Sequence, residues 1–208
     1  MTSQAKTRDF LRGVLLGVPI TLILLAVGGF IYLRYGNPPV ATADPPFPYE
    51  ARIVQIPLNA RINRQLSSPP FTPSVQDLDS GARIYLQQCA VCHGTPDHDS
   101  PLAKWMYPTI PQLWEKHKNG VVGVSDDDPG VSYWKIANGI RLTGMPAFGH
   151  ILGQTEMWQV TLLLKRADSI PPSVTAIFNE ARSADAQPSP TGTTEPPSKP
   201  GKSGSAKN

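Results

Sequence analysis

Cys89-Ala90-Val91-Cys92-His93 is a C-x-x-C-H motif, and the organisation of the chain can be worked out from it. Two thiols two residues apart, followed at once by an imidazole, form the pattern of covalent c-type haem attachment. In this chemistry the two sulfurs bond the vinyl groups of the porphyrin, and the histidine coordinates the iron. The 208-residue chain has only these two cysteines. We therefore predict that Cys89 and Cys92 attach one haem c and that His93 is an iron ligand.

Other interpretations of the cysteine pair fit less well. A thioredoxin-like redox pair needs a βαβ setting, whereas the residues before Cys89 have a helical pattern and those after His93 resemble a loop. A zinc site needs further ligands, and the chain offers only three more histidines and no second cysteine pair. A disulfide across two residues would close a very short loop and contribute little chain entropy.

A second iron ligand is predicted in Gly144-Met145-Pro146-Ala147-Phe148-Gly149. Met145 lies 52 residues after His93, and its glycine and proline neighbours favour a rigid loop that can hold a thioether in place. A methionine that only fills core space is the simpler alternative. Of the four methionines in the chain, Met106 is the one real rival.

Two longer stretches carry a family resemblance: Gly81-Ala82-Arg83-Ile84-Tyr85 before the motif, and the run from Tyr133 to Gly149 after it. With the motif, they make the chain resemble the membrane-anchored mono-haem class I cytochromes c over roughly Leu58 to Arg182. The resemblance implies an all-α, small cytochrome c-like haem domain, ligation of haem iron by His93 and Met145, and electron transfer without catalysis. It also implies that the helix carrying Gly81 and Tyr85 packs against the last helix of the domain.

The N-terminal part has the pattern of a membrane anchor. Val14 to Leu33 carries no formal charge and is long enough as a helix to cross about 30 Å of hydrocarbon. We predict a transmembrane anchor at 13–34, which contacts the lipid bilayer of a bacterial inner membrane. The basic residues of 1–12 predict a cytoplasmic N-terminus and a periplasmic haem domain. A cleaved signal peptide is the alternative, because Ala41-Thr42-Ala43 resembles a cleavage site.

Composition divides the remainder. Residues 35–75 are predicted to be a Pro-rich extended linker, within which 51–58 could instead add a strand or lie along the domain surface. Residues 76–183 are predicted to be the cytochrome c domain, and 184–208 a disordered tail rich in Pro, Ser and Lys. The formal net charge of +3 is too small to predict binding to nucleic acid.

Capping signals and periodicity predict the helices of the domain. One helix begins at Asp77 or Asp79 and ends near Cys89. A short helix is predicted over 112–118, and another from Pro129 to Asn138, where Asp126, Asp127 and Asp128 supply a cap. The last helices are predicted over 155–166 and 173–182.

Aromatic residues are predicted to surround the haem. Tyr107, with its neighbours Trp105 and Met106, is expected to lie against one haem edge, and Trp134 to exclude water from the iron. A carbonyl near here, that of Pro108, is expected to accept a hydrogen bond from Nδ1 of His93 and fix its tautomer.

Two filled axial positions leave no open site on iron, so we predict one-electron exchange in a respiratory chain. Membrane redox complexes or other electron-transfer proteins are the expected partners. Two alternatives stay open. The chain could be the electron-entry subunit of a dehydrogenase or oxidase complex, or a haem peroxidase or gas sensor in which Met145 is labile and His150 replaces it.

Overall fold

The computed structural model describes residues 3–118 and 120–185, and all the regular elements of this part are helical, as predicted. The described residues form two compact units, 3–65 with 104–110, and 66–103 with 111–118 and 120–185. The predicted disordered tail, 184–208, lies outside the described residues, except that 184 and 185 end the last helix.

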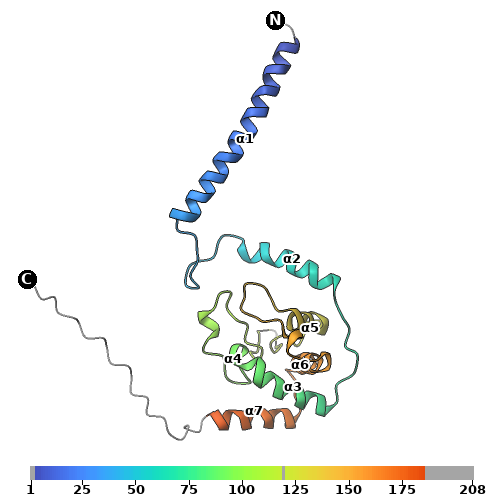
Figure 1. Cartoon of the computed structure of the whole chain (residues 1–208). Helices are drawn as coiled ribbons and strands as arrows, with labels where there is room; N and C mark the ends of the chain where they lie inside the picture. Colours follow the sequence, from blue (N-terminus) through green and yellow to red (C-terminus); the bar gives the residue numbers. More distant parts are fainter. Residues whose placement is uncertain (1–2, 119, 186–208) are drawn as a thin grey trace, which may run out of the picture. The chain divides into compact units, whose positions relative to one another are not determined.

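Helix α1, Ser3–Tyr35, opens the first unit (Figure 1). Its residues Arg8–Tyr35 contain an 18-residue window with a mean hydropathy of 2.6, and they are long enough to cross a membrane. No other described helix has this length and composition. The position of this candidate span matches the anchor predicted at 13–34, and its exposed apolar side chains fit lipid rather than a protein core.

Helix α2, Glu50–Arg64, corrects the prediction of an extended segment, because these 15 residues are helical. The prolines of this region gather on either side of the helix, which leaves Pro57 as the single proline inside it. Glu50 in the first turn and Arg61 and Arg64 in the last turn match the helix dipole at both ends. The high overall proline content therefore concealed a segment with good helix signals.

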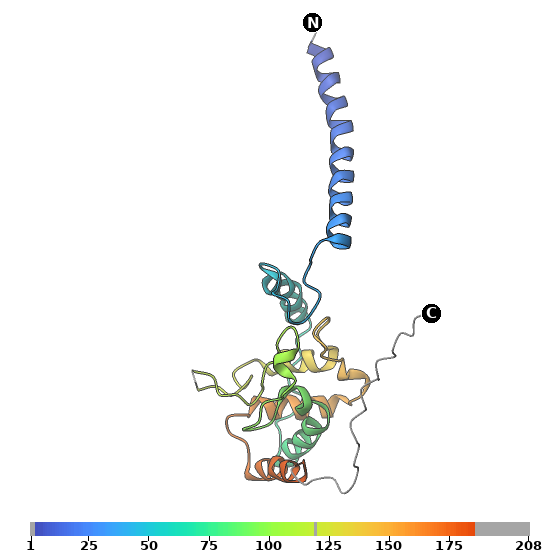
Figure 2. The same ribbon diagram turned by 90° about the vertical axis from the view of Figure 1, so that its left-hand side faces the viewer.

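The second unit contains five α-helices, and α3 packs against both α6 and α7 (Figure 1, Figure 2). Helix α5 packs on α6, and the short α4 follows directly from α3. The elements are α3 Val75–Gln88, α4 Ala90–His93, α5 Pro129–Asn138, α6 Gln154–Lys165 and α7 Pro172–Asp185, with 3-10 turns η1 Ala103–Trp105, at the boundary of the two units, and η2 Phe148–His150. The predicted helix 129–138 is confirmed, and those at 155–166 and 173–182 are confirmed within a few residues.

The start of α3 differs from the prediction, because Ser74 is the cap. Its Oγ accepts the Asp77 amide at 3.2 Å, and Asp77 Oδ2 accepts the Ser74 amide at 2.9 Å. Asp77 Oδ1 also accepts from Gln159 Nε2 at 3.0 Å, which ties α3 to α6. The Ser74 hydroxyl, then Gln159 and the Ser74 amide, lower the pKa of Asp77. Asp79 instead accepts from Ser173 of α7 at 2.7 Å.

The predicted helix over 112–118 is wrong, because this segment forms turns. The His117 amide donates to the carbonyl of Val121 at 2.8 Å, and Lys116 pairs with Val122. Gly123, at a φ of 53°, lies so close to Leu113 that a Cβ would overlap its carbonyl. The chain therefore reverses on itself here, which a helix cannot do.

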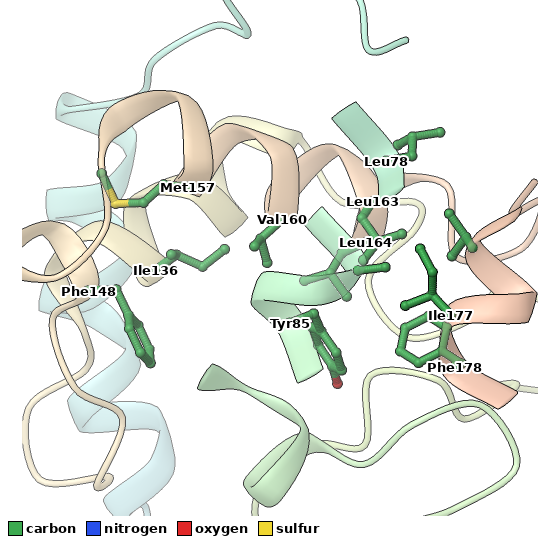
Figure 3. Close-up of a cluster of buried hydrophobic side chains, with 12 residues drawn as sticks. Leu78, Tyr85, Ile136, Phe148, Met157, Val160, Leu163, Leu164, Ile177 and Phe178 are labelled. Carbon is green, nitrogen blue, oxygen red and sulfur yellow. The ribbon is translucent and has the colours of Figure 1, made fainter. Parts of the chain in front are cut away.

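The core of the second unit lies where α3, α6 and α7 meet, and Tyr85, Leu163 and Val174 in it are fully buried. Figure 3 shows Tyr85, Leu163 and Phe178 among the side chains that point into this core. The Phe178 ring makes edge contacts with Trp114 at 4.9 Å and with Tyr85 at 6.1 Å between centroids. These contacts bring α7 into the same core as α3.

Gly81 is a point of close approach between α3 and α6. A Cβ at this position would overlap the backbone carbonyl of Gln159, because the two helix backbones lie against each other. The predicted packing of Gly81 and Tyr85 against a later helix is confirmed. Since backbone atoms cannot move aside as a flexible side chain can, even one methyl group must separate the helices.

We expect Gly81→Ala to lower the free energy of unfolding by about 1–3 kcal/mol, because overpacking forces α3 away from α6. Urea unfolding of the full chain in detergent, followed by circular dichroism, measures the change. The control is Gly153→Ser at the start of α6, where the nearest atom belongs to the flexible Glu156 side chain and serine is a good helix cap. Equal unfolding midpoints for the two variants would contradict the close approach.

Candidate functional site

The two cysteines lie at the junction of α3 and α4. Cys89 ends α3 and begins α4, and its carbonyl accepts the amides of Cys92 at 3.1 Å and of His93 at 2.9 Å. This single turn presents the three predicted site residues together. Both cysteines are half-buried free thiols, and Cys89 packs against the core of the unit.

The protonation of Cys89 argues against a redox-active pair. Burial, with a smaller contribution from Cys92, raises the pKa of the Cys89 thiol to about 12. A C-x-x-C pair that exchanges disulfides needs a thiol whose pKa lies well below the ordinary value. Cys89 is therefore protonated at neutral pH and suits a buried attachment point better than disulfide exchange.

His93 is held in one tautomer. Its Nδ1–H donates to the carbonyl of Pro111 at 2.9 Å, which leaves the lone pair of Nε2 available to a metal. Burial lowers the pKa of His93, so that the imidazole is neutral at pH 7. The acceptor is Pro111 and not Pro108 as predicted, because the chain at 111–113 runs beside α4: the Leu113 amide donates to the carbonyl of His93 at 3.2 Å.

Gln112 and Ser100 hold the residues around the motif. The Gln112 side chain donates to the carbonyl of Cys92 at 3.3 Å and accepts the Ser100 amide at 2.7 Å. The Ser100 hydroxyl donates to the carbonyl of Val91 at 2.6 Å. The sequence analysis missed both residues, because neither belongs to a motif and their partners lie 9 to 20 residues away in the chain.

The loop after His93 is held from two other elements. The hydroxyl of Tyr85 on α3 donates to the carbonyl of Gly94 at 2.8 Å, and Nη2 of Arg182 on α7 donates to the carbonyl of Pro96 at 2.9 Å. Burial raises the pKa of Tyr85, so its hydroxyl remains a donor at any ordinary pH. The backbone that follows His93 is thus fixed by both α3 and α7.

Met145 lies in a tight loop between α5 and η2. Its carbonyl accepts the Ile140 amide at 3.3 Å, and its amide donates to the Thr143 hydroxyl at 3.3 Å. Gly139, at a φ of 65°, lets this loop fold back, since a Cβ there would lie 2.7 Å from the carbonyl oxygen of Met145. The Met145 side chain is half-buried against the same core that Cys89 contacts.

The other methionines of the described part are placed differently. Met157 is a core residue of α6, only 5% exposed. Met106 belongs to the first unit, with α2. Met145 and Met157 thus both belong to the core that Cys89 contacts, and of the two Met145 is the half-buried one on a loop.

The two aromatic residues predicted to pack on haem have different settings. Trp134 on α5 is buried at 8% exposure, whereas Tyr107 is 37% exposed and belongs to the first unit. Trp105, beside it, is 70% exposed. The contacts of Tyr107 and Trp134 with haem remain predictions.

The donor set fits a c-type haem, since the Cys89 thiol and the Met145 thioether border one apolar core, and Cys92 and the neutral His93 lie in the turn that Cys89 begins. Within residues 3–118 and 120–185, no three His, Cys, Asp or Glu side chains come together as a metal cluster. The remaining histidines, His98, His117 and His150, are exposed. A zinc site is therefore not built by the described residues.

One protein-family model matches the part of the chain that contains this site. Residues 76–163 match the family model described as cytochrome C oxidase, cbb3-type, subunit III. The match begins in α3 and ends in α6, so it includes the C-x-x-C-H turn and the Met145 loop. A search of curated proteins found no match.

We expect Tyr85→Phe to lower the free energy of unfolding by about 1–2 kcal/mol, because the buried carbonyl of Gly94 loses its donor. Urea unfolding of the full chain measures this loss. Tyr133→Phe is the matched control: its ring stacks on Trp158 at 4.1 Å, and its hydroxyl makes no hydrogen bond with another described residue. A loss of equal size in both variants would show that the Gly94 hydrogen bond contributes nothing specific.

Proposed function

Because residues 76–163 form a cytochrome c domain, we propose that the chain is a one-electron carrier with a single covalently bound haem c. The observation that carries the proposal is the C-x-x-C-H turn, in which burial keeps His93 neutral and the carbonyl of Pro111 orients it. Cys89 and Cys92 would hold the porphyrin through thioether bonds. A haem c held here supplies an iron that cycles between Fe(III) and Fe(II).

The residues of the site set how this iron behaves. Nε2 of His93 and the thioether of Met145 would hold the haem iron. A thioether ligand favours Fe(II) and so raises the reduction potential. Two such ligands from the chain would leave substrate no access to the metal, which supports a carrier and not an enzyme. Trp134 excludes water from this side of the core.

Helix α1 supports a location at the membrane. We propose that it is a single-pass anchor in a bacterial inner membrane, with the N-terminus in the cytoplasm and the cytochrome c domain in the periplasm. The basic N-terminal residues support this orientation. Anchoring confines the carrier near membrane redox complexes of a respiratory chain, its proposed partners, and raises its effective concentration there.

The match to an oxidase subunit III family favours a second candidate, in which the chain is the haem-bearing electron-entry subunit of an oxidase complex. Purification of the tagged chain in mild detergent separates the two candidates. An oxidase that co-purifies in a fixed ratio supports the subunit, whereas isolation of the chain alone supports the free-standing carrier.

We expect the membrane-bound protein, matured in a host that attaches haem c, to carry a pigment that survives denaturing electrophoresis. Cys89→Ala/Cys92→Ala should abolish this haem stain, since no other thiol exists in the chain. Immunodetection of a tag measures the amount of chain in each sample. Loss of the haem stain at unchanged chain abundance can then be assigned to the missing thioether bonds. A stained band in this variant would refute covalent attachment at these residues.

We expect Met145→Ala to remove the weak far-red absorption band of a sulfur–iron bond from the ferric spectrum and to lower the reduction potential. Met106→Ala is the matched control and should retain both properties. Persistence of the band in Met145→Ala, with its loss in Met106→Ala, would assign the ligand to Met106.

A further inference from the structure

Helix α2 carries apolar side chains that no part of the described chain covers. Ile53 is 62% exposed, and Ile56 is 70% exposed. These residues and Ala60 lie three and four positions apart, so they share one side of the helix. Ile62, which is only 2% exposed, follows Ile53 by nine residues, or two and a half turns, and so lies on the opposite side. Ile62 is thus the one buried residue of α2, whereas Ile53, Ile56 and Ala60 form an open apolar strip on the other side.

Arginine side chains flank this apolar strip at both ends. Arg52, Ile56, Ala60 and Arg64 succeed one another at intervals of four, so an arginine stands at each end of the row. Both arginines are exposed, and neither forms an ion pair with another residue of the described chain. The only acidic residue of α2 is Glu50, whose carboxylate accepts the amide of Phe47 at 3.0 Å. The helix therefore has a net positive charge.

The chain brings α2 close to the end of the membrane-spanning helix. Only residues 36–49 separate the two, and a turn shortens this connection, because Asp44 Oδ2 accepts the amides of Val40 and Ala41 at 2.8 Å each. Exposed aromatic residues mark both ends of the connection, Tyr35 at one end and Phe47 and Tyr49 at the other. Aromatic rings of this kind gather at the level of lipid headgroups.

We propose that α2 lies in the headgroup region of the membrane that α1 crosses, with its Ile53–Ile56–Ala60 strip toward the acyl chains and Arg52 and Arg64 bound to anionic phospholipids. The arginine stems can lie along apolar surface while their charged ends reach the phosphates. This inference rests on the anchoring part of the proposed function.

Spin labels on α2 test the proposal in the full-length, haem-loaded protein, whose native cysteines are then consumed. Ile53→Cys and Ile56→Cys place nitroxides on the strip, and Ala51→Cys, two residues before Ile53, places the matched control on the opposite side. Each protein is reconstituted in vesicles of phosphatidylcholine, with or without phosphatidylglycerol. Collision rates with oxygen, which concentrates in lipid, and with a water-soluble nickel chelate then report the environment of each label.

With phosphatidylglycerol present, we expect oxygen collisions to dominate at 53 and 56 and chelate collisions to dominate at 51. Adding Arg52→Gln and Arg64→Gln to Ile56→Cys should lower the ratio of membrane-bound to free α2 by about fivefold for each arginine. On the unsubstituted chain, trypsin cleavage after Arg52 and Arg64 should be slower in vesicles that contain phosphatidylglycerol than in those that lack it.

Equal chelate collisions at all three positions, or cleavage that is indifferent to phosphatidylglycerol, would overturn the proposal. Labels shielded from both reagents, in vesicles and in detergent alike, would overturn it in favour of a protein partner on this strip. A carbonate wash tests the anchor separately. Extraction of the chain from the vesicles means that the proposed anchoring has failed, whereas a retained chain with water-exposed labels means that only the docking of α2 has failed.

Discussion

The hydrogen bond from Nδ1 of His93 to the carbonyl of Pro111 is the constraint on which the site depends. A histidine that coordinates iron must be neutral, must offer Nε2, and must keep its ring in one orientation. Burial disfavours the charged imidazole, and the Pro111 carbonyl selects the tautomer and the orientation. The backbone that supplies this carbonyl is in turn held by Gln112, whose side chain bridges Cys92 and Ser100.

Close backbone contacts within the domain fix the position of the C-x-x-C-H turn. Because Gly81 lets α3 contact α6 backbone to backbone, the end of α3 that carries Cys89 has a fixed position relative to the core. The Met145 loop reaches the same core through a different close approach, at Gly139. Two glycines therefore fix elements that bring the thiols and the thioether to one apolar interior.

Local sequence patterns were sufficient wherever a structure depends on neighbours in the chain. The C-x-x-C-H motif, the Asp-Pro start of α5 and the apolar run of α1 were all predicted at their observed places. Long-range contacts were not predictable in this way, since nothing in the pattern selects Pro111 over Pro108 as the partner of His93. Helix α2 was not predicted for another reason: the prolines on either side of it dominate the composition of residues 35–75 and hide its helix signals.

Helix α7 has a consequence for where the functional module ends. It lies beyond the family match at 76–163, yet it contributes Phe178 to the ring contacts with Trp114 and Tyr85, and Arg182 to the loop after His93. A fragment cut at the family boundary would expose the apolar surface that Val174, Ile177 and Phe178 now cover. The compact unit therefore begins at Leu66 and includes the whole of α7, so it is longer at both ends than the segment that matches the family.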